Sequence, residues 1–302
     1  MRSSAAPWTG SSVGRGAQPV RCSLLRKAEE TAIAALASSR HVIRLPLHGA
    51  WAVGAWLGGI PRPTRGIDLL DLEQGSAGDV VAALHDALGS CQEELAMDWS
   101  AMRIRTRAER RSPLHRVCIP ARIGRHRLEL RIAVMAARHP LPEVEFRPFQ
   151  VDDASCSPVW VACCTAEELV AEKLALLVTY GPDHTRVQDV LDIWLLLRRL
   201  RLDGPTLSEA MVGVFGGRDA ALMLGRGDGY CERAFDPERL DAPTRNRWDA
   251  LVQSANVQDS PVSLSDALTG IWQALGPLLL DLRQRSHRPC RAVVESASRV
   301  GA

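Results

Sequence analysis

Three charged residues near the middle of the sequence have the types and spacing to act together. Asp189 and Asp192 lie three residues apart in a segment with helical periodicity, and Lys173 lies in the helical segment before it. The later turns of the second segment are apolar all round, so this helix should be largely buried and its carboxylates need partners. Two interpretations stay open: the carboxylates orient Lys173 or an acceptor group, or they pair with Arg186 in their own helix.

Lys173 is itself a candidate phosphate ligand. Of the 37 basic residues, only Lys27 and Lys173 are lysines, a bias that a GC-rich genome would also produce. An ammonium and a guanidinium are not interchangeable at a phosphate, so a lysine at this position indicates that a compact charge is required there. Chance is the alternative explanation.

A glycine at position 49 marks a second candidate site. Gly49 follows an expected strand and precedes a small apolar helix over residues 50–57. A glycine at a strand end lets the backbone approach a ligand closely, and the N-terminus of a helix attracts phosphate. Gly49 and Ala50 are therefore candidate nucleotide-binding residues.

The next strand carries a further candidate residue. A Pro-flanked loop ends at Arg65, and a strand expected over residues 66–72 puts Gly66 and Asp68 on one face. Arg65 is a further candidate for nucleotide binding. Asp68 is either a carboxylate available to a ligand or a solvated strand end.

The elements that must position these residues can be read from periodicity and turn signals. Helices are expected over 24–39, 50–57, 77–88, 165–180, 185–198, 206–215, 243–255 and 263–283. Strands are expected over 42–47, 66–72, 144–149 and 159–163, with a hairpin formed by 116–121 and 127–135. This order predicts an α/β (α+β) fold in which a mixed sheet with flanking helices precedes a C-terminal helical domain. The predicted division is a disordered leader over 1–22, a core over 23–163, a helical domain over 164–284 and a flexible tail over 285–302.

Composition limits the setting of the protein. A net charge of +2 gives no strong attraction to nucleic acid, although the arginines from Arg103 to Arg125 either follow an RNA backbone or form a solvated, mobile face. Eight cysteines without metal spacing indicate reduced thiols, and hence the cytoplasm. No apolar run is long enough for a secretory signal or a membrane span, so no membrane partner is expected.

The two informative stretches carry a family resemblance. GAWAVGAWLGGIPRPTRGIDLL resembles the strand-end glycine and Asp-bearing strand of nucleotidyltransferase-fold proteins. AEKLALL, followed by TRVQDVLDIWLLL and LDGPTLSEAM, is similar to the AbiEii/AbiGii toxin family of abortive-infection and toxin–antitoxin systems, and SLSDALTGIWQALGPLL fits the helical end of that family. The resemblance extends over residues 42–282.

The resemblance implies transfer of a nucleotide from a nucleoside triphosphate to an acceptor such as RNA or tRNA, with Mg²⁺ as cofactor. It gives Asp68, Lys173 and Asp189 as catalytic residues, and Asp68 also as the ligand of the metal ion. Arg186 and Asp192 are supporting residues. Carboxylates that converge on two metal ions would supply this chemistry. An antitoxin-like partner is also implied.

The sequence departs from the family pattern where the metal ligands are expected. Gly66 stands at the first aspartate position of the Asp-x-Asp pair, and Arg131 stands at the third carboxylate position, on a neighbouring strand. Glu129, on the same strand face as Arg131, is a weak candidate for a displaced ligand. Two hypotheses therefore remain: an AbiEii-type nucleotidyltransferase, or a degraded relative that binds nucleotide, RNA or a protein without turnover.

Overall fold

The computed structural model describes residues 18–109, 112–138, 141–150, 157–181, 185–216, 222–226, 229–255 and 263–287. Its first part is a mixed sheet of eight strands. The strands are β1 Leu47–His48, β2 Ile67–Asp71, β3 Ala96–Met97, β4 Arg103–Glu109, β5 Ser112–Ile123, β6 His126–Ala136, β7 Val144–Phe149 and β8 Val159–Cys164. They lie in the order β3, β5, β6, β2, β1, β8, β7, and β4 pairs with the same edge of β5 as β3. The pairs β2–β6 and β1–β8 are parallel, and the other pairs are antiparallel.

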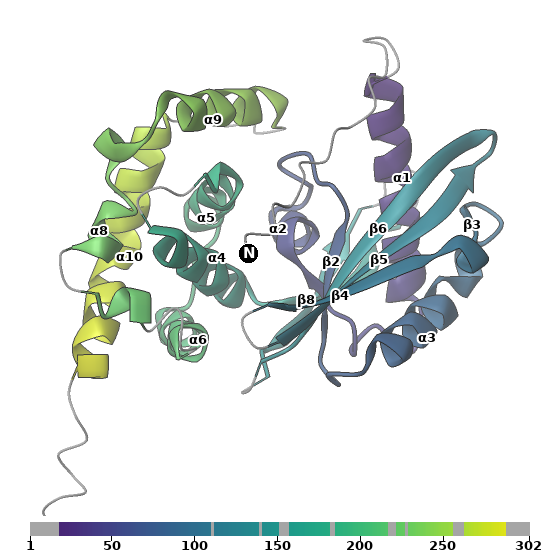
Figure 1. The fold of residues 1–302 in the computed structure, drawn as a ribbon, viewed down its shortest axis with the longest axis horizontal. Coiled ribbons are helices and arrows are strands. Elements are labelled where there is room, and N and C mark those ends of the chain that lie inside the picture. The colour runs from purple at the N-terminus through teal and green to yellow at the C-terminus, as the bar shows by residue number, and fades with distance from the viewer. Residues whose placement is uncertain are drawn as a thin grey trace, which may run out of the picture.

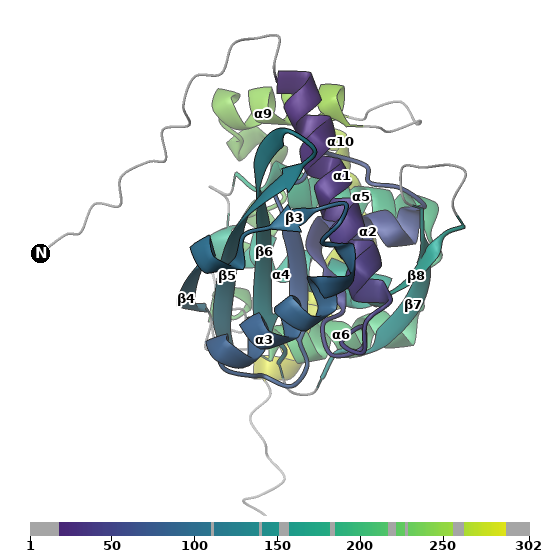
Figure 2. The same cartoon turned by 90° about the vertical axis from the view of Figure 1, so that its right-hand side faces the viewer.

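Helices flank the sheet and then form a second part. α1 Gln18–Ala37 and α3 Ala77–Leu88 lie together on one side of the sheet, and α2 Gly49–Leu57 follows β1 directly (Figure 2). The helical part consists of α4 Ala166–Tyr180, α5 Val187–Arg199, α6 Gly204–Phe215, α8 Tyr230–Arg233, α9 Ala242–Ser254 and α10 Leu264–His287. It stands beside the sheet in Figure 1. The predicted fold class, a mixed sheet with flanking helices followed by a helical region, is confirmed.

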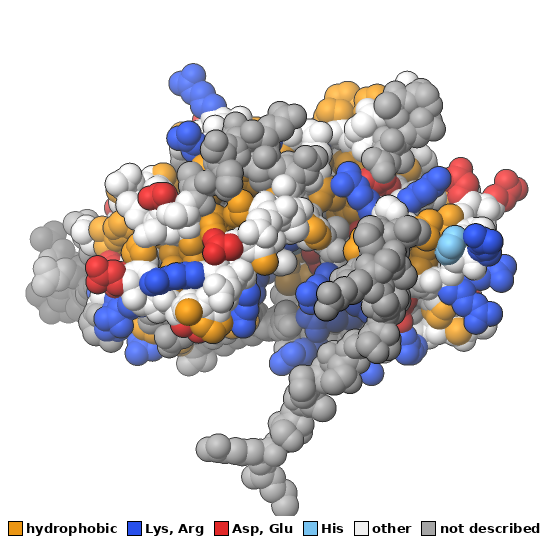
Figure 3. All heavy atoms as spheres, turned by 90° about the horizontal axis from the view of Figure 1, so that it is seen from above, with side chains coloured by type: hydrophobic (Ala, Val, Ile, Leu, Met, Phe, Trp, Pro, Cys, Tyr) orange, Lys and Arg blue, Asp and Glu red, His pale blue; other side chains and the backbone are white. Residues whose placement is uncertain are grey.

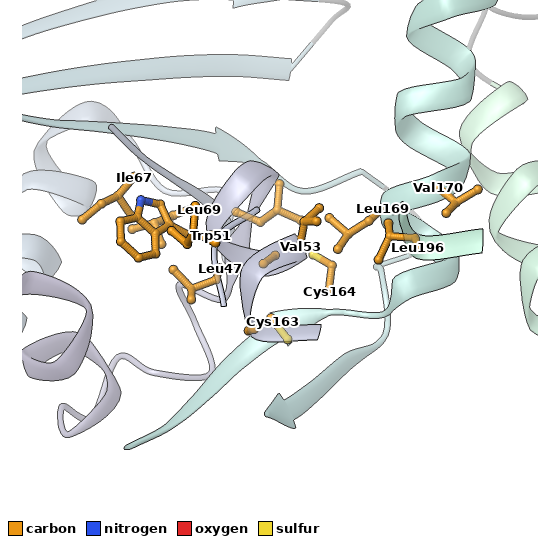
Figure 4. Packing of buried hydrophobic residues seen from close by; sticks show 14 of the residues in the cluster. Leu47, Trp51, Val53, Ile67, Leu69, Cys163, Cys164, Leu169, Val170 and Leu196 are labelled. Atoms are coloured by element: carbon orange, nitrogen blue, oxygen red, sulfur yellow. The ribbon is translucent and has the colours of Figure 1, made fainter. Parts of the chain in front are cut away.

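One apolar core runs through both parts. Side chains from the strands and from α2 contact residues of α4 and α5, and all belong to a single cluster. Figure 4 shows its path from Leu47 and Trp51 through Cys163 and Cys164 to Leu169 and Leu196. The two parts therefore hold each other in place, and residues from α4 and α5 can face the sheet at fixed distances.

Three local expectations need correction. The strand expected over 42–47 is only Leu47–His48, because residues 39–45 form turns in which Val42 N–H donates to Ser39 and Leu45 N–H donates to His41. No strand is expected between residues 88 and 116, yet residues 103–109 form strand β4, since alternating Arg and small or apolar residues pair with β5. α1 begins at Gln18, within the expected leader, and α10 continues to His287, past the expected start of the tail.

Two expectations about cysteines and membranes can be compared with the structure. The described cysteines, which include buried Cys163 and Cys164, form no disulfide with one another. Within the ranges given above, no helix has both the length and the apolar character needed to cross a membrane.

Candidate functional site

The first wall of the site is the corner where β1 passes into α2. Gly49 has φ of +61°, and a Cβ atom built there would lie 2.4 Å from Asp68 Oδ2, so only glycine fits. β1 pairs with β2 so that His48 lies opposite Asp68. His48 occupies the N-cap position of α2 without a side-chain cap, which leaves the first backbone N–H groups of this helix for a ligand.

A cavity of about 540 Å³ opens from this corner between the sheet and helices α4 and α5. Its floor includes Gly49, Ala50, Asp68 and the facing residues of β5 and β6. Its charged lining consists of His48, Arg62, Arg65, Asp68, Arg116, Arg131, Glu172, Lys173, Arg186 and Asp189. In Figure 3, Lys and Arg side chains gather beside the hollow between the two parts of the molecule. The cavity is therefore suited to an anionic ligand.

The second wall is a buried network of charges on α4 and α5. Lys173 Nζ lies 3.0 Å from Asp189 Oδ1 and 2.7 Å from Asp192 Oδ2. Arg62 donates from Nε to Asp192 Oδ1 at 2.7 Å and from Nη2 to Oδ2 at 2.6 Å. Arg186 donates to the second oxygen of Asp189. Both interpretations of the carboxylates are therefore correct for Asp189, which binds Lys173 and Arg186 at once.

The pKa shifts of Asp192 and Lys173 favour the charged form of each group. Burial works against the ionised form of Asp192, but Lys173 and Arg62 outweigh it and hold the pKa of Asp192 below its ordinary value. Burial likewise disfavours the ammonium of Lys173, and the two carboxylates reverse this effect and raise its pKa. Each charge is stabilised by the others, so the network is a rigid support with its lysine at the cavity surface.

A second charge cluster lies at the β1 end of the cavity. Glu172 contacts His48 Nε2 and Arg138 Nη2. Burial opposes the carboxylate, but both cations outweigh it and lower the pKa of Glu172 to about 2. Burial also opposes the imidazolium of His48, yet Glu172 raises the pKa of His48 above its ordinary value. Glu172 therefore favours the protonated form of His48, which lies opposite Asp68 in the strand pairing.

Among the described residues, Asp68 differs from these carboxylates because no basic side chain forms a hydrogen bond with it. Its side chain is accessible from the cavity although protein atoms surround it closely. This crowding raises the pKa of Asp68, while His48, Lys173, Arg62 and Arg116 act in the opposite direction. Asp68 is the carboxylate of the cavity wall that is open to a ligand.

The pairing register of β2 and β6 determines which residues lie beside Asp68. In the parallel pair of β2 and β6, Asp68 lies opposite Ala133, so Gly66 lies level with Arg131. A Cβ atom at Gly66 would lie 2.7 Å from the backbone oxygen of Arg131. Glu129 is not in the cavity lining, and its two oxygens bind Arg103 and Arg131. The structure therefore does not bring Glu129 to Asp68.

These residues do not fit a pair of magnesium ions. Two adjacent Mg²⁺ ions need several convergent carboxylates, whereas Glu172 and Asp189 are already held by cations and Asp68 stands alone. Among the described side chains, no group of three His, Cys, Asp or Glu residues is placed to hold a metal. At most one ion could use Asp68, with its other ligands supplied by phosphate and water.

Most predicted site residues do meet in one place. Gly49, Ala50, Arg65, Asp68, Lys173, Arg186 and Asp189 line the cavity, and Asp192 lies directly behind Lys173. The sequence did not indicate four further residues of the cavity: His48, Arg62, Arg116 and Glu172. Arg62 is 130 residues from its partner Asp192, and its position between two prolines was the available signal that the loop is rigid.

The fold and site together define an α/β protein with a mostly basic cavity between a mixed sheet and a helical part. Residues 32–270 match the family model described as nucleotidyl transferase AbiEii toxin, type IV TA system. This match spans most of the sequence, and the chain belongs to the AbiEii nucleotidyltransferase family.

Solved structures show weaker similarity. A candidate nucleotidyltransferase from H. pylori is 14% identical, with a TM-score of 0.46 over 88% of this chain and 96% of its own. JHP933 from Helicobacter pylori is 15% identical, with a TM-score of 0.47 over 91% and 97% of the two chains. No curated protein matches the sequence.

Proposed function

We propose that the cavity binds a nucleoside triphosphate and that this family member has lost the two-metal form of nucleotide transfer. The observation that carries the proposal is the surroundings of Asp68: one open carboxylate beside Gly49, in a cavity whose lining is mostly basic. Backbone N–H groups at the start of α2 and the cations around the cavity would hold the phosphates.

The phosphates would meet the two walls differently. On the sheet wall, Arg116 and Arg131 project from β5 and β6 toward the cavity. On the helical wall, Lys173 already holds two carboxylates, so it contributes a fixed charge rather than a mobile ligand. The predicted Mg²⁺ would arrive as a single ion on the triphosphate, with Asp68 as its protein ligand.

Calorimetry with each nucleoside triphosphate in Mg²⁺ tests the binding, and transfer of labelled nucleotide to bulk tRNA tests the reaction. We expect saturable binding of at least one triphosphate and no chelator-sensitive transfer. Arg116→Gln should weaken binding, whereas Arg198→Gln, at the far end of α5, should not. Absence of binding at millimolar concentration would refute the binding proposal.

A transferase with a single carboxylate is the competing hypothesis. It predicts robust Mg²⁺-dependent transfer by the unmodified protein and its loss in Asp68→Ala. The acceptor, whether tRNA or another RNA, and the antitoxin-like partner remain predictions from the family resemblance.

A further inference from the structure

The arginines of strands β4, β5 and β6 share one face of the sheet. Opposed residues of neighbouring strands project to the same side. Arg105 lies opposite Arg116, which lies opposite Ala133, and Ala133 lies opposite Asp68. The face that carries Asp68 therefore continues across three further strands to the edge of the sheet.

Seven arginines occupy this face, which we call the arginine face. β4 contributes Arg103, Arg105 and Arg107. β5 contributes Arg116 and Arg122, and β6 contributes Arg127 and Arg131. All seven side chains are exposed. Among the described side chains that β4, β5 and β6 place on this face, Glu129 is the acidic one.

Such a concentration of charge does not follow from composition, because the whole chain has a net charge of only +2. The opposite face of these strands is apolar and packs against α1 and α3. Guanidinium groups held this close repel one another, and a polyanion laid across them would relieve the repulsion. The triphosphate cavity reaches Arg116 and Arg131 but does not include the arginines of β4.

We propose that the arginine face binds the phosphodiester backbone of a nucleic-acid strand. Alternate residues of a strand are spaced by ~7 Å, which is comparable to the spacing of phosphates along an extended nucleic-acid strand. Arg105 and Arg107 lack an ion-pair partner within the described residues, so their donors face solvent. The line from β4 to β6 leads directly to Asp68 and the cavity.

The chemistry of the face also sets the mode of binding. The described positions on this face of β4, β5 and β6 include no aromatic residue on which a base could stack. Contacts are therefore confined to phosphates and sugars, which carry no sequence information. Binding should depend steeply on salt and be nearly independent of sequence. The inference does not rest on the proposed triphosphate binding, because Arg105 and Arg107 lie outside the cavity lining.

The test is the salt dependence of binding to a short labelled single-stranded RNA, followed by fluorescence anisotropy. The variant Arg105→Gln/Arg107→Gln removes two phosphate contacts. Since each contact releases about 0.7 counterion from a single strand, the slope of log K against log salt should fall by about 1.4. By the same relation, affinity at ~0.1 M salt should fall about 25-fold. The control Arg201→Gln/Arg247→Gln removes the same charge from exposed positions of the helical part and should leave the slope unchanged.

Three further measurements separate the alternatives. Single-stranded DNA of the same sequence should bind with a similar slope, because the backbone is what is recognised. Calorimetry with triphosphate should give the same result for the native protein and for Arg105→Gln/Arg107→Gln, which separates this face from the cavity. Circular dichroism checks that the exposed substitutions preserve the fold.

The proposal is overturned by any of three results: no RNA binding at low salt, equal losses in the variant and the control, or binding of polyglutamate but not of RNA. The last result would assign the face to an acidic protein instead.

Discussion

The two walls of the cavity use charge in opposite ways. On the helical wall, Lys173, Arg62 and Arg186 are matched by Asp189 and Asp192. On the sheet wall, Asp68 stands in a surface whose other charged residues are mostly arginines. The charged groups of the helical wall pair with one another within the protein. The sheet wall carries an excess of positive charge that a ligand can neutralise.

The difference teaches that a charged residue from a family motif need not act on a ligand. Lys173 and the aspartates of α5 form the most distinctive motif of the sequence, yet they mainly bind one another. Their buried network fixes the helical wall relative to the Arg62 loop and therefore to β2. Ligand recognition is left to the backbone at Gly49 and to the cations of the sheet.

The largest effect should come from breaking the helical wall at Asp192. This carboxylate is fully buried, with an exposed fraction of 0%, and binds both Arg62 and Lys173. Asp192→Ala would leave two buried cations without this partner, so we expect a loss of about 3–5 kcal/mol in the free energy of unfolding. Urea denaturation measures it.

Asp189→Ala is the matched control for Asp192→Ala. Its partner Arg186 is partly exposed and can bind water, and Lys173 would keep Asp192. The loss should be smaller than for Asp192→Ala. Equal losses would mean that the two aspartates support the wall equally.

A buried carboxyl that forms no ion pair within the described residues sharpens the same comparison. Glu29 on α1 is 1% exposed, and within the described residues its Oε1 has no hydrogen-bond partner. Burial raises its pKa to about 8. The unfolded chain releases this proton near pH 4.5. Between pH 4.5 and about pH 8 the unfolded state therefore binds fewer protons than the native state, and the free energy of unfolding falls as pH rises.

Glu29→Gln should therefore stabilise the protein at pH 8, by on the order of 2–4 kcal/mol, and have almost no effect at pH 4. Thermal unfolding of both proteins across this range gives the difference. A constant difference at every pH would show that ionisation of Glu29 is not its cause.

Much of the fold follows from local patterns in the sequence. The apolar periodicity over 77–88 is enough to predict the range of α3, and the capping box at Ser76 agrees with its start. Thr165 and Gly181 bound α4 as their cap chemistry predicts. β4 was missed because its alternate arginines look like a solvated loop until the neighbouring strand β5 is known.

The site was predictable only in part, for a physical reason. Gly49, Asp68 and Lys173 stand in recognisable contexts of strand ends and helix faces. Arg62 and Glu172 acquire their roles from partners on other elements, namely Asp192 and His48. Such pairings depend on the packing of the helical part against the sheet, and no local pattern encodes them.

A smaller effect is expected at Gly49, where the sheet wall meets α2. Gly49→Ala places a non-glycine residue at φ of +61°, at a cost of about 1–2 kcal/mol, and its Cβ displaces the carboxylate of Asp68. We expect triphosphate binding to be lost, as measured by calorimetry.

Gly58→Ala, at the other end of the same helix, is the control for Gly49→Ala. Gly58 has φ of +75°, but nothing lies within 4 Å of its Cβ position. This variant should show a similar loss of stability and keep binding. Loss of binding in both variants would place the cause in the backbone of α2 rather than in the contact with Asp68.

The smallest effect is expected from an attempt to rebuild the missing metal ligands. Gly66→Asp with Arg131→Asp would supply the carboxylates that the family pattern has at these positions. The Cβ of Asp at position 66 would lie 2.7 Å from the backbone oxygen of residue 131, and replacing the side chain of Arg131 does not move that oxygen. The added carboxylate cannot turn toward Asp68 unless β2 and β6 separate, and hydrogen bonds of their parallel pairing oppose this. We therefore expect transfer of labelled nucleotide to tRNA to stay at the level of the Arg131→Ala control. Chelator-sensitive transfer by the double variant, and not by the control, would contradict this expectation. It would show that β2 and β6 can move apart enough to admit the new carboxylate, and that these two substitutions are sufficient to restore a functional metal site.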